Sequence, residues 1–434
     1  MRDKFVIKGL NGKKTLSGKI EVNGAKNAVL KLMASSILFA DGIETLGIPK
    51  IEDVKRMAEL LEDLGAVIEP RKKGGFYINT TKLNKSDLNR DISEKIRASI
   101  VLTGPLLARF GKTSFPVPGG CVIGARSVDF FIDGFRKMGA TAVFQNGEYQ
   151  IKAKRGGLRG AEIFFKTPSV TATETFIMAG VLAKGKTILK NVAMEPEIKN
   201  LADFLISCGA KIKGAGTPVI EIKGGQLLKS KGRKYKAMPD RLEAGSFLVL
   251  GALCADNLEI TNCVPEHIEI LIQMLKDAGV PIKVGKNNIK IEGNGKIKNK
   301  DFKINGTIKT KEYPGFPTDL QAPMMMFLTQ ATGENLVFET IFEGRLNYTE
   351  DLVRMGANII MLDPHRVMVK GPTSLRGREV ESPDLRAGLA FVIAGILAKG
   401  ESIIDNVYLI DRGYERVEER LKKIGVNIER VSKN

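Results

Sequence analysis

The chain has 434 residues, of which 67 are Lys or Arg and 49 are Asp or Glu, so its formal net charge is +18. Hydrophobic residues make up 43% of the sequence, which is enough to fill the cores of two or three domains and excludes fully disordered and fibrous proteins. A basic balance of this size permits binding to nucleic acid or to small anions.

The sequence predicts a soluble cytoplasmic protein. Residues 1–14 contain no unbroken apolar stretch of the kind that a signal peptide needs. The longest apolar stretch, Leu389 to Ala398, has only about half the length of a membrane span. The four cysteines show no CxxC spacing and there are only two histidines, so we expect a reducing compartment and no metal site.

Taken in chain order, six amphipathic helices are predicted, each ending at a glycine that precedes a small residue and a β-like segment. These glycines, which lie roughly 70 residues apart, are Gly65, Gly139, Gly209, Gly279, Gly356 and Gly425. A helix that ends at such a glycine should bury positions at helical spacing. The residues one, four and eight places before each glycine can all pack apolar surface, so each helix should bury one face.

Upstream of each amphipathic helix lies a more apolar helix, rich in Ala and Gly, which we expect to be the inner one. These helices should end near Gly42, Gly111, Gly185, Asn257, Gly333 and Gly400. The β segments are short and rich in Val, Ile and Lys, as in Val219 to Lys223 and Asn288 to Glu292. Each unit therefore consists of two helices against a small sheet, which is an α/β arrangement.

Three such units can bury one another's inner helices and form a domain, so six units predict two similar domains. The boundary should fall in the basic stretch Lys229 to Lys236, before Pro239, which has the composition of an exposed linker. This stretch is also the densest basic cluster, and aromatic residues for base stacking are not interleaved elsewhere. Solvated surface lysine therefore explains most of the charge better than nucleic-acid binding does.

Polar residues gather where the inner helices begin. Unpaired N–H groups and the positive end of the helix dipole make such starts natural sites for phosphate or carboxylate. The residues there are Lys26 with Asn27; Arg97; Ser169 with Thr171; Asp240, Arg241 and Glu243; Asp319 with Gln321; and Asp384 with Arg386. Ser169 and Asp240 could equally be simple N-caps. A Lys or Arg is unfavourable at a helix start unless an anion joins it.

Arg126 and Arg412 stand thirteen residues before the last glycine of their units, a place that the other four units give to Glu or Pro. The sequence therefore predicts both arginines at equivalent helix starts. If the two domains face each other, both could converge with Lys26 on one multiply charged anion. We favour such a phosphate clamp over surface salt bridges because Arg offers a planar, bidentate fork.

A glycine-rich loop, Pro116 to Gly124, carries Cys121 and leads to Arg126. Such a loop can bend and close over a ligand. A thiol near a helix start and an arginine is more acidic than a core thiol, whereas Cys208 falls on a buried helix face and Cys254 in an apolar helix. Cys121 is thus the chemical candidate among the cysteines, and a small residue tolerated in a flexible loop is the alternative.

Short motifs follow one another from about Lys4 to Val431. They are GAKNA at Gly24 to Ala28, IRASI with GPLLARFG at Ile96 to Gly111, PGGCVIGAR at Pro118 to Arg126, EPEI at Glu195 to Ile198, PDRLEAGSF at Pro239 to Phe247, PGFPTDLQA at Pro314 to Ala322, DLRAG at Asp384 to Gly388 and IDRGYER at Ile410 to Arg416. Together they resemble the enolpyruvyl transferase family, which includes EPSP synthase, and within it the branch that acts on UDP-N-acetylglucosamine.

The resemblance implies a two-domain inside-out α/β barrel of six βαβαββ repeats, three in each domain. Residues 1–22 and 239–434 would form one domain, and residues 23–238 the other, which carries the cysteine loop. The implied reaction transfers the enolpyruvyl group of phosphoenolpyruvate to the 3-hydroxyl of UDP-N-acetylglucosamine and releases phosphate. It is the committed step of peptidoglycan synthesis, and so serves cell wall biogenesis, cell shape, the cell cycle and cell division. It needs no metal or organic cofactor.

The resemblance also implies the site residues. Phosphoenolpyruvate would be bound by Lys26, Asn27, Arg126, Asp384, Arg386 and Arg412. UDP-N-acetylglucosamine would be bound by Asn27, Arg97, Arg126, Ser127, Val128, Asp129, Phe130, Thr167, Pro168, Ser169, Val170, Asp319, Ile341 and Arg345. Cys121 resembles the loop cysteine that protonates the methylene carbon and is the target of fosfomycin, and Asp319 resembles the carboxylate that takes the proton of the sugar hydroxyl. Lys26, Arg126 and Arg412 complete the catalytic set.

The chain departs from the commoner family pattern at several positions, among them Phe131, Thr167, Thr171 and Gly344. Phe131 also falls on a buried helix face, so packing explains it. The other three lie near the nucleotide positions, where affinity could differ. None of the four removes a catalytic group.

Two alternatives stay open. The acceptor could be another UDP-sugar, a nucleotide or shikimate 3-phosphate, although GAKNA and the cysteine loop favour the UDP-sugar branch. A nucleic-acid-binding protein is the alternative from another class, because RNA 3′-phosphate cyclases are built on related repeats. We expect two small-molecule substrates, no nucleic acid, no membrane partner and a monomer.

Overall fold

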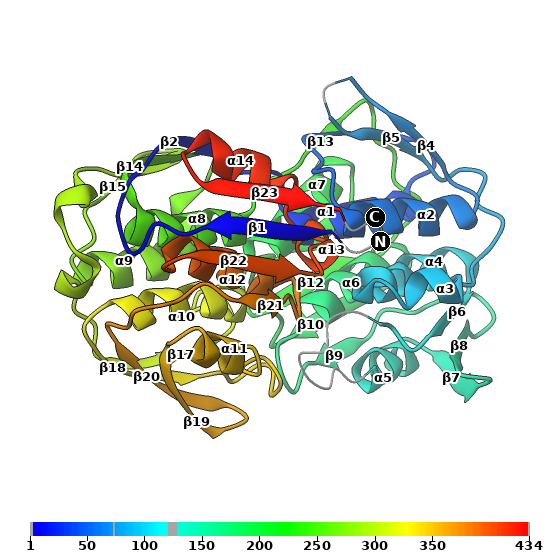
Figure 1. Ribbon diagram of the computed structural model, residues 1–434. Helices are drawn as coiled ribbons and strands as arrows, with labels where there is room; N and C mark the ends of the chain where they lie inside the picture. The colour runs from blue at the N-terminus through cyan, green and yellow to red at the C-terminus, as the bar shows by residue number, and fades with distance from the viewer. Residues whose placement is uncertain (1–2, 73, 120–127, 433–434) are drawn as a thin grey trace. The chain divides into compact units, whose positions relative to one another are not determined.

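The computed structural model describes residues 3–72, 74–119 and 128–432 (Figure 1). These residues form two compact units, which we describe separately. Unit 1 comprises residues 3–23 and 239–432, and unit 2 comprises residues 24–119 and 128–238. The chain passes from one unit to the other at residues 23–24 and 238–239.

The described part of unit 1 contains three four-stranded mixed sheets. In each sheet one edge strand is parallel to its neighbour, and the remaining pairs are antiparallel. In order across each sheet, the strands are β21 (Glu379–Glu381), β22 (Glu401–Asp405), β1 (Lys4–Lys8) and β23 (Asn427–Val431); β15 (Ile282–Val284), β16 (Asn288–Ile291), β14 (Ala255–Thr261) and β2 (Leu16–Glu21); and β17 (Gly306–Lys309), β18 (Gly333–Phe338), β20 (Arg366–Gly371) and β19 (Asn358–Asp363).

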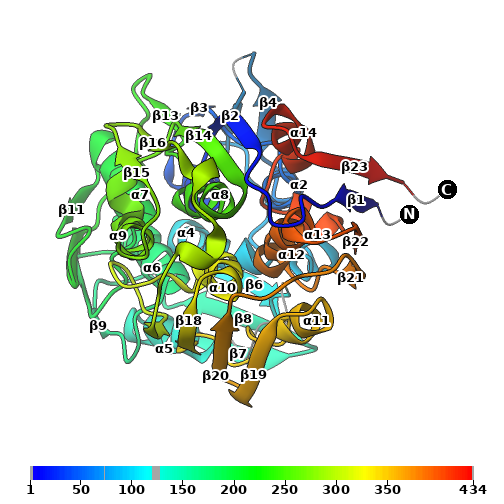
Figure 2. The same ribbon diagram turned by 60° about the vertical axis from the view of Figure 1, so that its left-hand side comes forward.

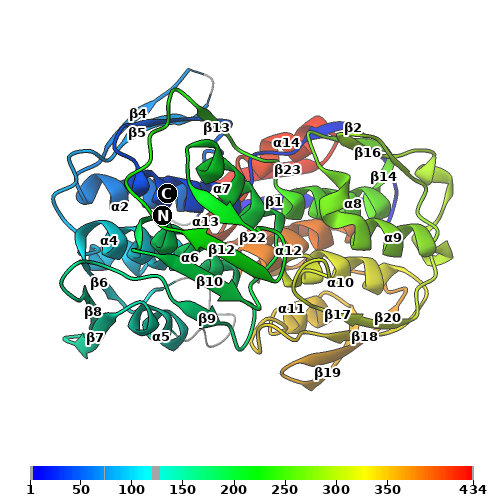
Figure 3. The same ribbon diagram turned by 180° about the vertical axis from the view of Figure 1, so that it is seen from behind.

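Three apolar helices form the interior of unit 1, and they are buried on every face because nearly all their residues are apolar or small. They contact one another and lie side by side in Figures 1 and 3. They are α8 (Arg241–Cys254), α10 (Gln321–Gln330) and α12 (Leu385–Leu397). In Figure 2, strands β18, β20 and β19 lie beneath α10, which contacts β20.

Outer helices and short turns complete unit 1. The helices are α9 (Glu269–Asp277), α11 (Thr349–Arg354), α13 (Tyr408–Asp411) and α14 (Val417–Lys423), and the 3₁₀ turns are η3 (Pro265–Ile268), η4 (Asn294–Lys296), η5 (Asn299–Asp301) and η6 (Thr318–Leu320).

Unit 2 repeats the strand order of unit 1. Its sheets are β11 (Lys211–Lys213), β12 (Val219–Lys223), β10 (Lys186–Lys190) and β9 (Glu162–Phe164); β13 (Lys234–Lys236), β3 (Ile43–Leu46), β5 (Phe76–Asn79) and β4 (Val67–Pro70); and β6 (Lys112–Pro116), β8 (Glu148–Ala153) and β7 (Ala140–Gln145). In the last sheet an isolated parallel bridge between Asp87 and Ser114 takes the place of the parallel edge strand.

The helices of unit 2 follow the same plan. The inner ones are α1 (Lys26–Ser35), α4 (Thr103–Phe110) and α6 (Val170–Leu182), and the outer ones are α2 (Glu52–Asp63), α5 (Asp129–Lys137) and α7 (Pro196–Ser207). A short helix and two 3₁₀ turns also occur: α3 (Arg90–Ser93), η1 (Ser36–Leu38) and η2 (Arg97–Leu102). The elements β9, α6, β10, α7, β11 and β12 follow one another as strand, helix, strand, helix and hairpin.

The predicted outer helices are confirmed. All six glycines have positive φ angles, between 88° and 109°, a conformation that glycine adopts without steric cost. The residues four places earlier are each 0% exposed: Leu61, Phe135, Leu205, Leu275, Leu352 and Leu421. The residues one and eight places earlier are buried as well, so the repeated apolar stripe is one buried helix face.

One prediction from the sequence, that of an exposed linker, is wrong in part. The stretch Lys229 to Lys236 is not all linker, because β13 occupies its end and pairs in parallel with β3. The side chain of Tyr235 is 3% exposed between two exposed lysines, which is the alternation of a strand with one buried face. The predicted ends of the inner helices are confirmed, as in α8, which ends at Cys254, three residues before Asn257.

Within the described residues, no helix combines the length and apolar character that crossing a membrane would require.

Candidate functional site

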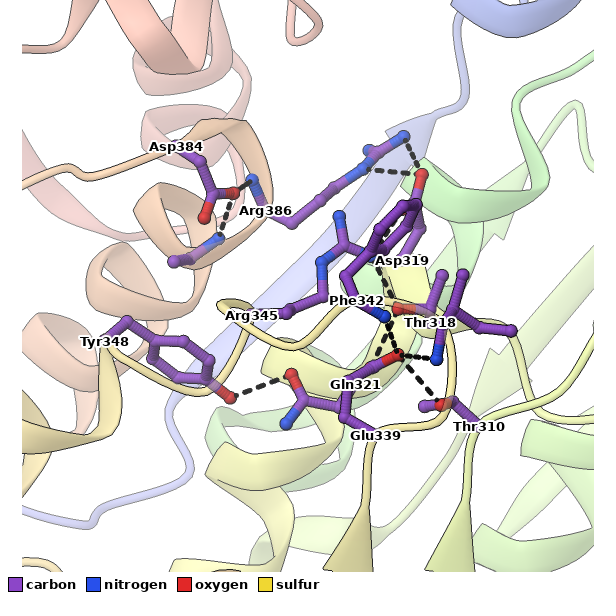
Figure 4. A network of polar contacts seen from close by, with 12 residues as sticks. Thr310, Thr318, Asp319, Gln321, Glu339, Phe342, Arg345, Tyr348, Asp384 and Arg386 are labelled. Atoms are coloured by element: carbon purple, nitrogen blue, oxygen red, sulfur yellow. Dashed lines mark hydrogen bonds and ion pairs between the residues drawn. The ribbon is translucent and has the colours of Figure 1, made fainter. Parts of the chain in front are cut away.

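Asp319 lies in η6, immediately before the buried helix α10, and its carboxylate is held between two arginines (Figure 4). Nη1 of Arg345 donates a hydrogen bond to Asp319 Oδ1 at 2.7 Å, and Nε of Arg386 donates to Oδ2 at 3.2 Å. The arginine side chains are 6% and 5% exposed, whereas that of Asp319 is 25% exposed. A partly accessible carboxylate thus lies between two buried cations.

Both guanidinium groups stay charged. Burial works against the charge of Arg345, but the carboxylates of Asp319, Asp384 and Glu339 outweigh it and raise the Arg345 pKa. Burial also opposes the charge of Arg386, and Tyr414 and Asp319 outweigh it and raise that pKa. Fixed positive charges next to one carboxylate suit a site that receives an anion and moves a proton.

Asp384 positions the start of α12. Its Oδ1 accepts hydrogen bonds from the backbone N–H groups of Arg386 at 2.7 Å and Ala387 at 3.1 Å, so Asp384 is the N-cap of this helix. The cap directs Arg386 out of the first turn toward Asp319. On its other side, Nη1 of Arg386 donates to the hydroxyl of Tyr414 at 2.8 Å.

Arg412 does not begin an outer helix, so that prediction is wrong. It follows the last residue of α13, and α14 begins only at Val417, after Arg416 in a left-handed conformation. A cation at the end of a helix is favoured by the dipole, so the argument that an anion must compensate it does not apply to Arg412. Arg412 is nevertheless 7% exposed.

In unit 2, Lys26 is the first residue of α1, as predicted, and Asn27 follows it. Nζ of Lys26 lies 2.8 Å from Oδ2 of Asp53, which belongs to the first turn of α2. The cation at this helix start is therefore compensated by a carboxylate of the same unit.

Arg97 begins the 3₁₀ turn η2, and its Nη1 donates to the carbonyl oxygen of Pro118 at 3.1 Å. Ser169 is the N-cap of α6, with Oγ accepting from the N–H of Ala172, and Asp240 is the N-cap of α8. The N-cap alternative therefore describes both residues.

The residues expected at the nucleotide lie on two segments of unit 2. Val128, Asp129 and Phe130 form the start of α5, and residues 167–170 lead into α6. The ring centroids of Phe130 and Phe165 are 4.8 Å apart, so the first segment contacts the chain two residues before the second. Phe131 is 5% exposed and stacks on Phe176, so packing accounts for it as expected. Thr167 is exposed.

Cys121, Arg126 and Ser127 lie outside the described residues. Each of the other three cysteines is buried, and burial raises its pKa, to about 12 for Cys254 and about 11 for Cys263. Thiols of this kind are poor nucleophiles, so the comparison that left Cys121 as the chemical candidate is supported for the described cysteines.

The predicted residues thus fall into two sets. In unit 1, Asp319, Arg345 and Arg386 are in contact, Asp384 caps the helix of Arg386, and Ile341 lies four residues before Arg345. In unit 2 lie Lys26, Asn27, Arg97 and the two nucleotide segments.

Sequence reasoning missed several residues that contact the predicted ones, among them Asp53, Thr318, Glu339 and Tyr414. Tyr414 and Thr318 lie inside quoted motifs, two residues after Arg412 and one before Asp319. Glu339 carries a weak signal, a single acid directly after an apolar β segment.

Comparison with known proteins defines the class. The model of the family described as EPSP synthase (3-phosphoshikimate 1-carboxyvinyltransferase) matches residues 10–421. The chain therefore belongs to this family and is a transferase, as the motifs predicted.

Curated relatives then define the branch. The chain is 42% identical over 417 residues to the UDP-N-acetylglucosamine 1-carboxyvinyltransferase of Thermodesulfovibrio yellowstonii, covering 96% of this chain and 97% of the relative. It is 43% identical over 433 residues to the protein of the same name from Acidobacterium capsulatum, covering 99% and 96%. The relative of this name from Halothermothrix orenii is 41% identical and covers 99% of both chains.

Solved structures share the fold. The enolpyruvyl transferase NikO from Streptomyces tendae superposes with a TM-score of 0.85 at 20% identity, covering 100% of both chains. EPSP synthase from Acinetobacter baumannii gives a TM-score of 0.73 at 18% identity, covering 99% of this chain and 100% of that one. The chain thus has the mixed α/β fold of the enolpyruvyl transferases.

Proposed function

We propose that the protein transfers the enolpyruvyl group of phosphoenolpyruvate to the 3-hydroxyl of UDP-N-acetylglucosamine and releases phosphate. Relatives of that name, more than 40% identical over nearly the whole chain, support this reaction. The observation that carries it is the Asp319 carboxylate, one-quarter exposed at the start of α10 and bound by two buried guanidinium groups.

In the proposed reaction, the oxygen of the sugar 3-hydroxyl attacks the C2 atom of phosphoenolpyruvate, and Asp319 takes the proton of that hydroxyl. Cys121 supplies a proton to the methylene carbon. Loss of a proton from that carbon then expels phosphate and restores the double bond. The reaction needs a base for oxygen, an acid for carbon and cations around the leaving phosphate.

We assign the remaining residues by the same proposal. Lys26, Arg126 and Arg412 hold the phosphate and carboxylate of phosphoenolpyruvate, with Asn27, Asp384 and Arg386 beside them. Within unit 2, the ammonium group of Lys26 also donates a hydrogen bond to Oδ2 of Asp53 at 2.8 Å. UDP-N-acetylglucosamine contacts Arg97, Ser127 to Phe130, Thr167 to Val170, Ile341 and Arg345.

The two units correspond, in this proposal, to the two domains of an inside-out α/β barrel with three βαβαββ repeats each. The common strand order of the sheets supports it. We further propose a cytoplasmic monomer that acts at the committed step of peptidoglycan synthesis, and thereby in cell shape and division, and that fosfomycin inactivates.

The reaction is tested by incubating the protein with both substrates and measuring phosphate. We expect release that depends on both, and Asp319→Asn should abolish it. Asp203→Asn, which removes an exposed carboxylate paired with Lys199, is the matched control and should retain activity. No release at saturating substrate would refute the proposal.

A competition between acceptors separates the alternatives. UDP-N-acetylglucosamine should outcompete other UDP-sugars, free nucleotides and shikimate 3-phosphate. Faster release with any of these would reassign the acceptor while keeping the enolpyruvyl transfer.

A further inference from the structure

Glu339 has a buried carboxylate that is surrounded by hydrogen-bond donors (Figure 4). It directly follows β18 and is 0% exposed. Its Oε1 accepts from the hydroxyl of Thr310 at 3.0 Å and from the backbone N–H groups of Ile341 at 2.9 Å and Phe342 at 3.2 Å. Its Oε2 accepts from the hydroxyl of Thr318 at 2.8 Å. The carboxylate therefore joins the segment before Asp319 to the segment before Arg345.

The Thr318 hydroxyl connects the Glu339 carboxylate to Arg345. It has one hydrogen, which it donates to Glu339, so its oxygen accepts from Nη1 of Arg345 at 2.8 Å. The same Nη1 donates to Asp319 Oδ1 at 2.7 Å. Because an ionised carboxylate only accepts, it fixes the direction of every hydrogen bond in this chain.

The negative charge of Glu339 also stabilises the Arg345 guanidinium. Glu339 is among the carboxylates that outweigh the effect of burial on Arg345 and raise its pKa. Arg345 therefore faces Asp319 directly and Glu339 through one hydroxyl.

We propose that Glu339 is a positioning residue for the transfer reaction: acting through Thr318 and the backbone of residues 341–342, it fixes the Arg345 guanidinium and thereby the orientation of the Asp319 carboxylate. This inference rests on the proposed function of Asp319 as the base. It assigns to Glu339 no contact with substrate.

The substitution Glu339→Gln isolates this role because it preserves the volume. In the variant, an amide NH₂ replaces one oxygen, and an NH₂ that faces Thr318 donates to it. The Thr318 hydroxyl then loses its acceptor and can no longer present its oxygen to Arg345 undisturbed. We expect kcat for phosphate release to fall about 10- to 100-fold, with KM for each substrate changed less than threefold.

The pH profile distinguishes positioning from stability. When Arg345 is displaced, Asp319 loses part of the positive charge that favours its ionised form, so the acid limb of the kcat profile should move to higher pH. A general loss of stability would lower activity without moving this limb. Thermal unfolding, measured on the same samples, reports stability separately.

Thr318→Val removes the connecting hydroxyl and should reproduce both the loss of kcat and the pH shift. Thr318→Ser keeps the hydroxyl, so its kcat should stay within threefold of wild type. The double variant Glu339→Gln with Thr318→Val should be no worse than either single one, since both break the same link. The control is Thr329→Val, which removes a buried hydroxyl of α10 that bonds to Met326 and Gln330, and it should leave kcat unchanged.

An active wild type with Glu339→Gln and Thr318→Val both within threefold of its kcat would overturn the inference and leave the proposed function intact. Additive losses in the double variant, or an unshifted acid limb, would also overturn it. If Glu339→Gln does not fold, the Thr318 pair decides alone. A wild type that releases no phosphate would instead overturn the proposed function.

Discussion

Arg345 contacts two oxygens with one nitrogen, and this geometry makes it irreplaceable by lysine. Its Nη1 donates to both Thr318 and Asp319, and its guanidinium carbon lies 5.2 Å from the centroid of the Phe342 ring. A lysine ammonium is a compact point charge that cannot reproduce this fixed, planar set of donors. Arg386 shares the property, because it spans Asp319 and Tyr414.

The hydroxyl of Tyr414 should matter for catalysis although it is buried away from solvent. In Tyr414→Phe the buried guanidinium of Arg386 loses an acceptor, and hydrogen bonds to charged groups contribute about 1.5–3 kcal/mol. We expect kcat/KM for phosphoenolpyruvate to fall about 10- to 100-fold. Steady-state phosphate release measures it, and Tyr149→Phe, on a strand of unit 2, is the control. Equal effects of the two substitutions would contradict the role given to Tyr414.

Cys121 lies outside the described residues, and its proposed role can be tested by exchanging the acid. In Cys121→Asp a carboxylic acid can still protonate the methylene carbon, but it cannot form the covalent adduct that a thiolate forms. We expect the variant to release phosphate and to resist fosfomycin after preincubation. Cys263→Ala, at a buried thiol, should stay sensitive. Full inactivation of the Cys121→Asp variant would count against the role of this cysteine.

At the scale of helices and strands, local periodicity carried most of the information. The stripe before each glycine and the positive φ angle of that glycine depend on residues close in sequence, so they could be predicted. The pairing of β13 with β3 could not, because it joins segments about 190 residues apart in the chain.

In the site, too, only the features that depend on residues close in sequence could be predicted. Helix starts predicted Lys26, Asp319 and Arg386, because capping and dipole effects are local. The partners Asp53 and Glu339 reach the site only through tertiary packing, and the sequence around them gives at most a weak signal.

The buried carboxyl group of Glu174, which lies between two inner helices, makes the stability of unit 2 depend on pH. Nζ of Lys31 in α1 lies 3.1 Å from Oε2 of Glu174 in α6, and their side chains are 7% and 0% exposed. Burial raises the pKa of Glu174 from 4.5 to about 7, although Lys31 lowers it. Between these values the folded chain holds a proton that the unfolded chain has lost, so stability falls as pH rises from about 4.5 to about 7.

Glu174→Gln should remove this part of the pH dependence. The unfolding temperature of the variant, relative to wild type, should rise steadily across that window and level off above it. Thermal unfolding at several pH values measures the difference, with the exposed Glu379→Gln as control. Curves that run parallel for wild type and Glu174→Gln would show that Glu174 does not titrate in this range.

At the scale of the whole molecule, the net charge of +18 divides into two kinds of cation. Arg345, Arg386 and Arg412 are each at most 7% exposed and belong to the site or its motifs. Many lysines instead lie exposed on strands and outer helices, among them Lys152 and Lys276. Exposed charges more than about 8 Å from a ligand are largely screened at physiological salt, so the second kind should contribute little to substrate binding.

A variant that combines Lys152→Gln, Lys276→Gln and Lys399→Gln tests this division. It removes three exposed charges, and we expect kcat/KM within twofold of wild type in about 0.15 M KCl. Arg386→Gln removes one charge and should lower kcat/KM at least 100-fold, because it removes one of the two buried cations at Asp319 and the guanidinium that donates to Tyr414. RNA binding, if present at low salt, should disappear under the same conditions, since contacts by scattered surface lysines depend steeply on salt. Comparable losses in the two variants would mean that the surface charge takes part in binding the anionic substrates.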